Sequence, residues 1–212
     1  MKTRRKPSEE KGRAGAARQG LLFIPDISGF TRLVRSTDVH TGQRITFELL
    51  SVLLEQNRIG LQLAEVEGDA LLFYRFGPPP RLEELLRQCV VMRRAFDRKL
   101  RELQPSVAQA LSLSLKVIAH YGPMIRFEIG GFRKLYGEVV IEAHRLLKNE
   151  VAGDSYLLLT DSLHEAMKDT RQEQKAGSHS PFQILCEAYS GLRKICFSCF
   201  DFRRTAGPAL AA

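Results

Sequence analysis

The sequence of 212 residues contains no long apolar run, and this absence excludes a protein that spans a membrane with helices. A membrane-spanning helix needs about 20 consecutive apolar residues, and no stretch of the chain approaches that length without a charged residue. The charged N-terminus is not followed by an apolar segment of the kind that a secretory signal contains. We therefore expect a soluble, cytoplasmic protein that does not associate with membranes.

Cysteine is scarce, and its spacing does not predict a metal site. The chain has four, at Cys89, Cys186, Cys196 and Cys199, and the last two form its one CxxC pair. In an alternating strand, residues 196 and 199 point to opposite faces. No second pair completes a four-ligand zinc site. We therefore expect buried, reduced thiols.

Positive charge is concentrated near the N-terminus. The net charge is +8, and residues 1–19 hold seven Lys or Arg side chains against Glu9 and Glu10. Because large apolar residues are few there, the segment is predicted to be a disordered basic tail. Such a tail can touch nucleic acid or another anionic surface, although a solvated tail is the commoner case. The remaining chain is only mildly basic, so nucleic-acid binding is not predicted.

Hydrophobic periodicity predicts one folded domain over residues 20–202, followed by a C-terminal tail at 203–212. Alternating or fully apolar runs predict strands, and a helical period predicts helices. The predicted strands are 20–25, 111–122, 123–132 and 155–160, with hairpins at 61–76 and 181–202. The predicted helices are 42–57, 81–103, 137–150 and 161–169, with a short helix or turn at 29–36. This order predicts an antiparallel or mixed sheet with helices mainly on one face.

Two carboxylates stand where apolar strands end or turn. Asp26 follows the apolar start of FIPDISGFT and precedes Gly29, and Asp69 follows Gly68 in EVEGDALLF. A carboxylate in an apolar setting needs compensation, for Asp26 either by a cation or by the N-terminus of the next helix. Asp69 alone is typical of a hairpin turn. Together the two side chains can share Mg²⁺ or Mn²⁺, which prefer oxygen ligands, and Gly29 lets main-chain N–H groups approach phosphate.

Four motifs occur in the order in which one enzyme family carries them. They are PDISGFT (25–31), EGDALLF (67–73), HYGP with FEIGG (120–131) and YGEVVIEAHRLL (136–147). Residues 20–202 resemble the class III nucleotide cyclase catalytic domain of adenylyl and guanylyl cyclases. The match is closer to small, poorly characterised cyclase-like proteins than to the well-studied enzymes. The resemblance implies an α+β, ferredoxin-like (βαββαβ-type) fold.

The resemblance also implies a site for a nucleoside triphosphate and two divalent ions, Mg²⁺ or Mn²⁺. Asp26 and Asp69 would be the metal carboxylates, with the Ile27 carbonyl as a further ligand. The phosphates would be held by residues 27–31, which are Ile27, Ser28, Gly29, Phe30 and Thr31. In this family the site lies between two chains, so a homodimer is implied in which the second chain supplies Arg145 as the catalytic arginine. The reaction would yield a 3′,5′-cyclic nucleotide and pyrophosphate by two-metal chemistry.

The chain departs from the family where the sugar and the base are held. Family members have an asparagine four residues before the arginine, and here Ile141 stands there without a hydrogen-bonding group. Its neighbour Glu142 points about 100° away on a helix and is assigned no role. The base-reading positions carry Glu65 and Lys134, which either contact a base edge or pair with each other and close the pocket.

These departures leave more than one function open. The chain is either a slow cyclase or a catalytically silent homologue that binds nucleotide and metal in signalling or dimerisation. A third possibility is an adaptor, in which the basic tail binds a partner and the cyclase-like fold is only a scaffold. The residues do not identify the base.

Overall fold

The computed structural model describes residues 15–104, 113–169, 183–188 and 192–202. The described strands are β1 (Arg18–Ser28), β2 (Gln62–Glu67), β3 (Ala70–Phe76), β4 (Ser114–Ile129), β5 (Phe132–Tyr136), β6 (Tyr156–Thr160), β7 (Gln183–Ala188) and β8 (Lys194–Asp201). The described helices are α1 (Phe30–Ser36), α2 (Val39–Glu55), α3 (Leu82–Leu103), α4 (Glu138–Leu146) and α5 (Asp161–Asp169). Strands and helices follow one another in the predicted order.

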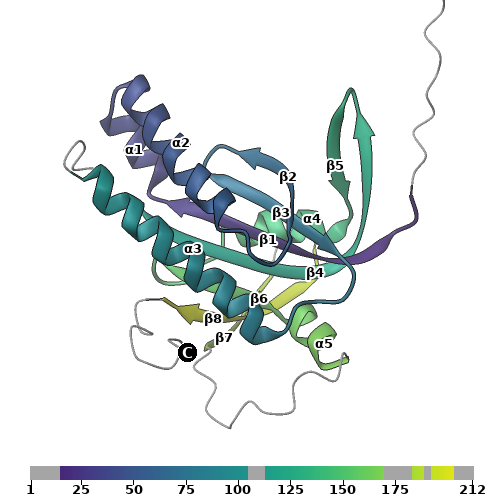
Figure 1. The fold of residues 1–212 in the computed structure, drawn as a ribbon. Coiled ribbons are helices and arrows are strands. Elements are labelled where there is room, and N and C mark those ends of the chain that lie inside the picture. Colours follow the sequence, from purple (N-terminus) through teal and green to yellow (C-terminus); the bar gives the residue numbers. More distant parts are fainter. Residues whose placement is uncertain (1–14, 105–112, 170–182, 189–191, 203–212) are drawn as a thin grey trace, which may run out of the picture.

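The strands form one mixed sheet in the order β2-β3-β1-β4-β6-β8-β7, and β5 pairs with the outer half of β4 (Figure 1). Each described pairing is antiparallel except that of β4 with β6, which is parallel. This mixed, mostly antiparallel open sheet confirms the predicted α+β fold class.

Alternation along β1 divides the apolar core into two layers. Leu21 and Phe23 belong to the layer shared with α2, α3 and α5, whereas Leu22 and Ile24 belong to the layer shared with α4. Successive side chains of a strand point to opposite faces of the sheet, so one apolar strand supplies both layers. The helices therefore lie mainly on one face, as predicted, with α4 on the other (Figure 1).

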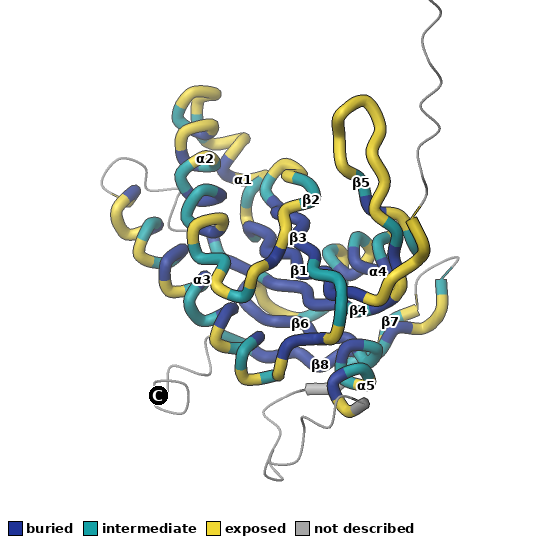
Figure 2. The backbone as a smooth tube through the Cα atoms, turned by 45° about the vertical axis from the view of Figure 1, so that its right-hand side comes forward, coloured by how far each residue is buried: buried dark blue, intermediate teal, exposed yellow. Residues whose placement is uncertain are grey.

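Strand β4 is longer than the sequence analysis predicted. The prediction of a return strand over 123–132 is wrong, because β4 continues through Pro123 to Ile129. The chain reverses instead at Gly130 and Gly131, whose φ angles of 57° and 82° suit glycine. The resulting β4–β5 hairpin projects from the sheet, and most of its outer part is exposed (Figure 2).

Two of the four cysteines are joined. Cys186 and Cys196 lie opposite each other on β7 and β8 and form a disulfide, so the expectation of reduced thiols is wrong for this pair. Cys89 and Cys199 are buried and free, as expected. Burial raises the pKa of the Cys199 thiol to about 11.

The predicted tails lie largely outside the described residues. Strand β1 begins at Arg18, within the segment 1–19 that the sequence analysis assigned to the basic tail. Residues 1–14 and 203–212, and the predicted turn at 190–191, are not among the described residues. Across the described ranges, no helix combines the length and the apolar character that a membrane crossing requires.

Candidate functional site

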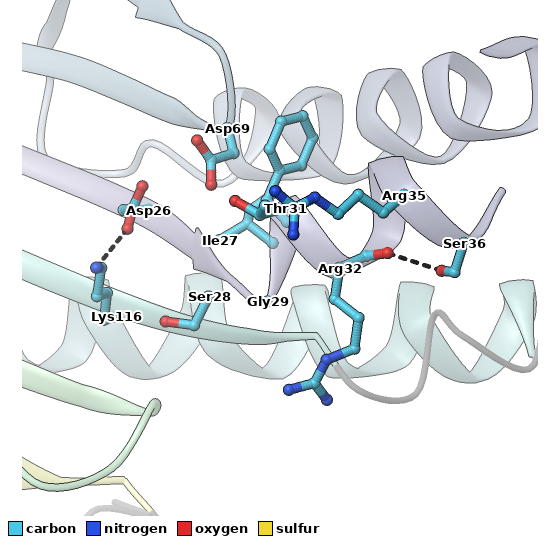
Figure 3. Close-up of a pocket in the computed structure, with 11 residues that line it drawn as sticks. Asp26, Ile27, Ser28, Gly29, Thr31, Arg32, Arg35, Ser36, Asp69 and Lys116 are labelled. Carbon is cyan, nitrogen blue, oxygen red and sulfur yellow. Dashed lines mark hydrogen bonds and ion pairs between the residues drawn. The ribbon is translucent and has the colours of Figure 1, made fainter. Parts of the chain in front are cut away.

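A cavity of about 650 Å³ opens where β1 ends, between the β2–β3 turn and α1 (Figure 3). Its lining consists of Asp26, Ile27, Ser28, Gly29, Phe30, Thr31, Arg32, Arg35, Ser36, Asp69 and Lys116. The two carboxylates expected to bind metal and the segment expected to hold phosphate thus surround one space, although 43 positions separate Asp26 from Asp69 in the chain.

The sharp turn from β1 into α1 depends on Gly29. This residue has a φ of 89°, in the left-handed region that glycine adopts readily. Gly29 is also the N-cap of α1, and no side chain caps this helix, so Asp26 is not a helix cap. The N–H of Ile27 donates to the main-chain carbonyl of Asp69 at 3.2 Å, which ties the end of β1 to the β2–β3 turn.

The Asp26 carboxylate is compensated by a cation. Asp26 is 9% exposed, and Lys116, opposite it on β4, places Nζ 2.8 Å from a carboxylate oxygen. The same ammonium donates to the carbonyl of Leu147 at 2.9 Å. The choice between a cation and a helix N-terminus is therefore resolved in favour of a cation. Sequence reasoning missed Lys116, because its position depends on the register between β1 and β4.

The pKa of Asp69 reflects both its burial and a second carboxylate nearby. Burial and the negative charge of Asp26 raise the pKa of Asp69 above its usual range, while Lys116 acts in the opposite direction. Figure 3 shows both carboxyl groups beside the cavity. A divalent cation would relieve this repulsion, and carboxylate oxygens are ligands that Mg²⁺ and Mn²⁺ prefer.

The protein offers a small set of metal donors. Within the described ranges, no group of three or more His, Cys, Asp and Glu side chains is placed to hold a metal ion. A metal in the cavity would therefore depend on the two carboxylates, on a main-chain oxygen and on oxygens of the ligand itself. This donor set fits a cation that retains ligand phosphates and waters.

Two arginines of α1 also line the cavity. Arg32 and Arg35 are exposed, and neither guanidinium has a hydrogen bond or ion pair with any residue that the structure describes. Residues three apart lie on neighbouring positions of a helix surface. Sequence reasoning missed this pair, and the available signal was its spacing directly after the Gly-Phe-Thr turn.

Glu65 and Lys134 lie outside this cavity. Glu65 is on β2 and Lys134 is on β5, and their side chains form an ion pair with each other. Of the two alternatives left open by the sequence, the structure therefore shows the mutual pair. Neither residue lines the cavity around Asp26 and Asp69.

The cavity and Arg145 are not brought together within one chain. Arg145 is exposed on α4, whereas α1 packs on the opposite face of the sheet. Ile141 lies one turn earlier on α4 and is 53% exposed. The position that carries asparagine in the cyclase family thus presents an apolar side chain at the surface.

A buried ionic network fastens α4 to the sheet. The Glu142 oxygens lie 2.8 Å from Nε2 of His120 and 2.8 Å from Nε of Arg193. His120 is fully buried, and its Nδ1 lies 2.9 Å from the hydroxyl oxygen of Thr160. Burial acts to raise the pKa of Glu142, but His120 and Arg193 together lower it below its usual value. Glu142 therefore links α4 to β4 and to the segment before β8, and the sequence analysis did not predict this role.

A family model and one curated relative match this chain. Residues 46–156 match the family described as "Protein of unknown function (DUF2652)". The "Uncharacterized protein Rv2561/Rv2562" of Mycobacterium tuberculosis is 31% identical over 121 residues, which are 52% of this chain and 55% of that protein. The match thus spans about half the length of this curated relative.

Solved structures share the fold at low sequence identity. The adenylyl cyclase CyaB from Pseudomonas aeruginosa is 18% identical, with a TM-score of 0.64 over 90% of this chain and 98% of that chain. The guanylyl cyclase Cya2 is 13% identical, with a TM-score of 0.66 over 88% and 93%. A class III adenylyl cyclase-like ATP-binding protein from Pseudomonas aeruginosa is 16% identical, with a TM-score of 0.58 over 71% and 35%. The chain therefore belongs to the DUF2652 family and has the fold of class III adenylyl and guanylyl cyclase domains.

Proposed function

We propose that the protein is a slow class III cyclase that converts a nucleoside triphosphate into a 3′,5′-cyclic nucleotide and pyrophosphate. The observation that carries this proposal is the single cavity that gathers Asp26, Asp69 and residues 27–31. The shared fold supports it, since adenylyl and guanylyl cyclases are among the proteins with that fold.

In this proposal Asp26, Asp69 and the Ile27 carbonyl hold two divalent ions, Mg²⁺ or Mn²⁺. When bound, such ions supply positive charge that activates a hydroxyl nucleophile and neutralises a leaving pyrophosphate. Main-chain N–H groups of residues 28–31 and the Lys116 ammonium bind phosphate oxygens, while the Ile27 N–H stays bonded to the Asp69 carbonyl. The ribose 3′-oxygen forms a bond to the α-phosphorus, the bond from that phosphorus to the bridging oxygen breaks, and pyrophosphate and a proton leave.

A homodimer completes the proposed site. Arg145 is exposed on α4 and does not line the cavity of its own chain. A second copy supplies its Arg145 to the phosphates, where a guanidinium matches the charge that develops in the transition state. Apolar side chains on the projecting hairpin support self-association, with Phe132 73% exposed and Tyr136 70% exposed.

Two observations explain why the reaction is slow and favour a second candidate function. Ile141 has no hydrogen-bonding group to position the ribose. Glu65 and Lys134 form an ion pair with each other. Loss of a positioning group reduces a rate by orders of magnitude without abolishing it. The second candidate is a catalytically silent homologue that binds nucleotide and metal in signalling or dimerisation.

The test is a comparison of ATP, GTP, CTP and UTP in the presence of Mn²⁺ or Mg²⁺. Calorimetry measures binding, and mass spectrometry measures the cyclic product and pyrophosphate. We expect metal-dependent binding and slow product formation, and we expect Asp26→Ala to abolish product formation. Asp97→Ala is the matched control, because Asp97 pairs with Arg93 on α3, away from the cavity.

Each outcome separates the two candidates. Product that depends on metal and on Asp26 establishes the cyclase. Metal-dependent binding without product after long incubation replaces the cyclase with the silent homologue. The absence of binding for all four nucleotides overturns both candidates.

A further inference from the structure

The cationic side chains that line the cavity outnumber its two carboxylates. Arg32, Arg35 and Lys116 all line it, and only Lys116 is paired with a carboxylate of the site. In the view of Figure 3, the Arg35 side chain runs back along α1 in the direction of Asp69, and that of Arg32 leaves α1 on another side. Helical side chains tilt toward the N-terminus of their helix, so both arginines are carried toward the β1–α1 turn.

The two arginines are available to a ligand. Neither guanidinium has a hydrogen-bond or ion-pair partner among the described residues. A guanidinium is planar, remains charged and matches phosphate oxygens with two parallel hydrogen bonds. Metal ions bound to Asp26 and Asp69 would remove the negative charge that the carboxylates contribute. The remaining wall is cationic and suits a polyphosphate chain.

The groups expected to contact a base are engaged elsewhere. The Glu65 carboxylate and the Lys134 ammonium form an ion pair between β2 and β5, outside the cavity. A base edge that contacts either group would have to compete with the attraction between two opposite charges that lie in contact. The structure therefore offers phosphate contacts that are free and base contacts that are occupied.

We infer that the cavity selects its ligand by the number of phosphates and not by the base, so that inorganic tripolyphosphate binds as tightly as a nucleoside triphosphate. This inference rests on the proposed function, because it uses the same cavity and the same phosphate-binding segment. It assigns Arg35 and Arg32 as the residues that distinguish a triphosphate from shorter phosphates.

The experiment is calorimetry on the full chain at a fixed Mg²⁺ concentration. The ligands are the four nucleoside triphosphates, inorganic tripolyphosphate, pyrophosphate and phosphate. We expect the five triphosphate-bearing ligands to agree within about threefold in Kd, and affinity to fall with each phosphate removed. We expect Arg35→Ala to weaken tripolyphosphate and nucleoside triphosphate equally, by about tenfold, and Arg32→Ala to act in the same direction.

Arg44→Ala is the matched control, because Arg44 is exposed on α2 and does not line the cavity. If the four nucleotides bind but differ by more than about tenfold in Kd, or if tripolyphosphate does not bind, selection by phosphate number is overturned while the proposed function stands. An Arg35→Ala variant that matches the parent in affinity also overturns it. If no phosphate ligand binds, the proposed function fails together with the inference.

Discussion

Asp26 and Glu142 are both buried carboxylates, and different cations compensate them. Asp26 pairs with one lysine across two neighbouring strands. Glu142 receives contacts from His120 on β4 and from Arg193 just before β8, so three separate segments meet at one side chain. Removing one partner of a buried ionic pair leaves the other charge uncompensated and is costly. Glu142 therefore contributes to the placement of α4, the helix that carries Arg145.

This role predicts a loss of stability when Glu142 is changed to Gln. The amide cannot accept from both His120 and Arg193 as the carboxylate does, so we expect the free energy of unfolding to fall by about 1–3 kcal/mol. Urea denaturation measures the difference. Glu138→Gln is the control, because Glu138 is exposed on the same helix. Equal unfolding midpoints for the two variants would contradict the structural role of Glu142.

The same variant tests the direction of the pKa shift. The pKa of Glu142 is lower in the folded chain than its ordinary value of 4.5, so the unfolded chain binds more protons in acid. The stabilisation is complete above pH 4.5 and is lost as the pH falls through the lower, folded-state pKa. We therefore expect the stability difference between the parent and Glu142→Gln to shrink on acidification. A difference that grows in acid would show that the pKa is raised instead.

Local motifs pointed to Asp26, Asp69 and residues 27–31, which line one cavity in the structure, while their roles stay predictions. Lys116 was not predicted, since its contact with Asp26 depends on how two distant strands align. Glu142 shares the buried side of α4 with Val139, and an acid within an apolar helical stripe was an available signal of a buried pair. The sequence therefore predicts local chemistry better than partners from distant segments.

At the scale of elements, the order of strands and helices was predictable because hydrophobic periodicity is local. The extent of β4 was not. Gly122 and Pro123 have turn chemistry, but their neighbours pair with β1 as far as Arg18, opposite Met124, and this pairing keeps the chain extended. The actual reversal at Gly130 and Gly131 also had a sequence signal. The pairing of β4 with β1 therefore determined which of the two glycine-containing segments forms the turn.

The disulfide between β7 and β8 predicts that stability depends on the redox state. Cys186 and Cys196 are 10 residues apart, and closing a loop of this size restricts the unfolded chain. We expect Cys186→Ser to lower the free energy of unfolding by about 2–3 kcal/mol under oxidising conditions. With a reducing agent present, the parent and the variant are expected to unfold at similar urea concentrations. A constant difference in both conditions would assign the loss to packing and not to the bond.

At the scale of the whole molecule, one chain presents two incomplete halves of the proposed site. The cavity lies beside α1, and Arg145 and Ile141 lie on α4 and are not among the residues that line it. A twofold dimer places the same two surfaces against each other twice. Exposed apolar side chains on the β4–β5 hairpin, including Ile129 and Phe132, are the kind of surface that a second copy covers.

This arrangement predicts that two inactive variants restore activity when mixed. Asp26→Ala removes the metal side of the site, and Arg145→Ala removes the partner's side. A mixed dimer has one site with both changes and one intact site, so refolding an equal mixture should restore about one quarter of the parent activity. Cyclic product formation measures the rescue.

The control adds Phe132→Glu to both variants, which places a charge on the exposed hairpin. We expect the rescue to disappear and the sedimentation coefficient to fall to that of a single chain. If the mixture is no more active than the two variants measured separately, Arg145 does not act across a dimer interface.

Strand β4 joins the hairpin to the cavity without interruption. Lys116 stands near its inner end and Ile129 at its outer end, and a strand rising 3.3 Å per residue covers roughly 40 Å between them. A partner that binds the outer end would therefore contact the same strand that places Lys116 in the cavity wall. Shortening the hairpin to obtain a convenient monomer would alter the strand that carries the lysine paired with Asp26. We therefore expect a shortened chain to bind nucleoside triphosphates less tightly than the intact protein does.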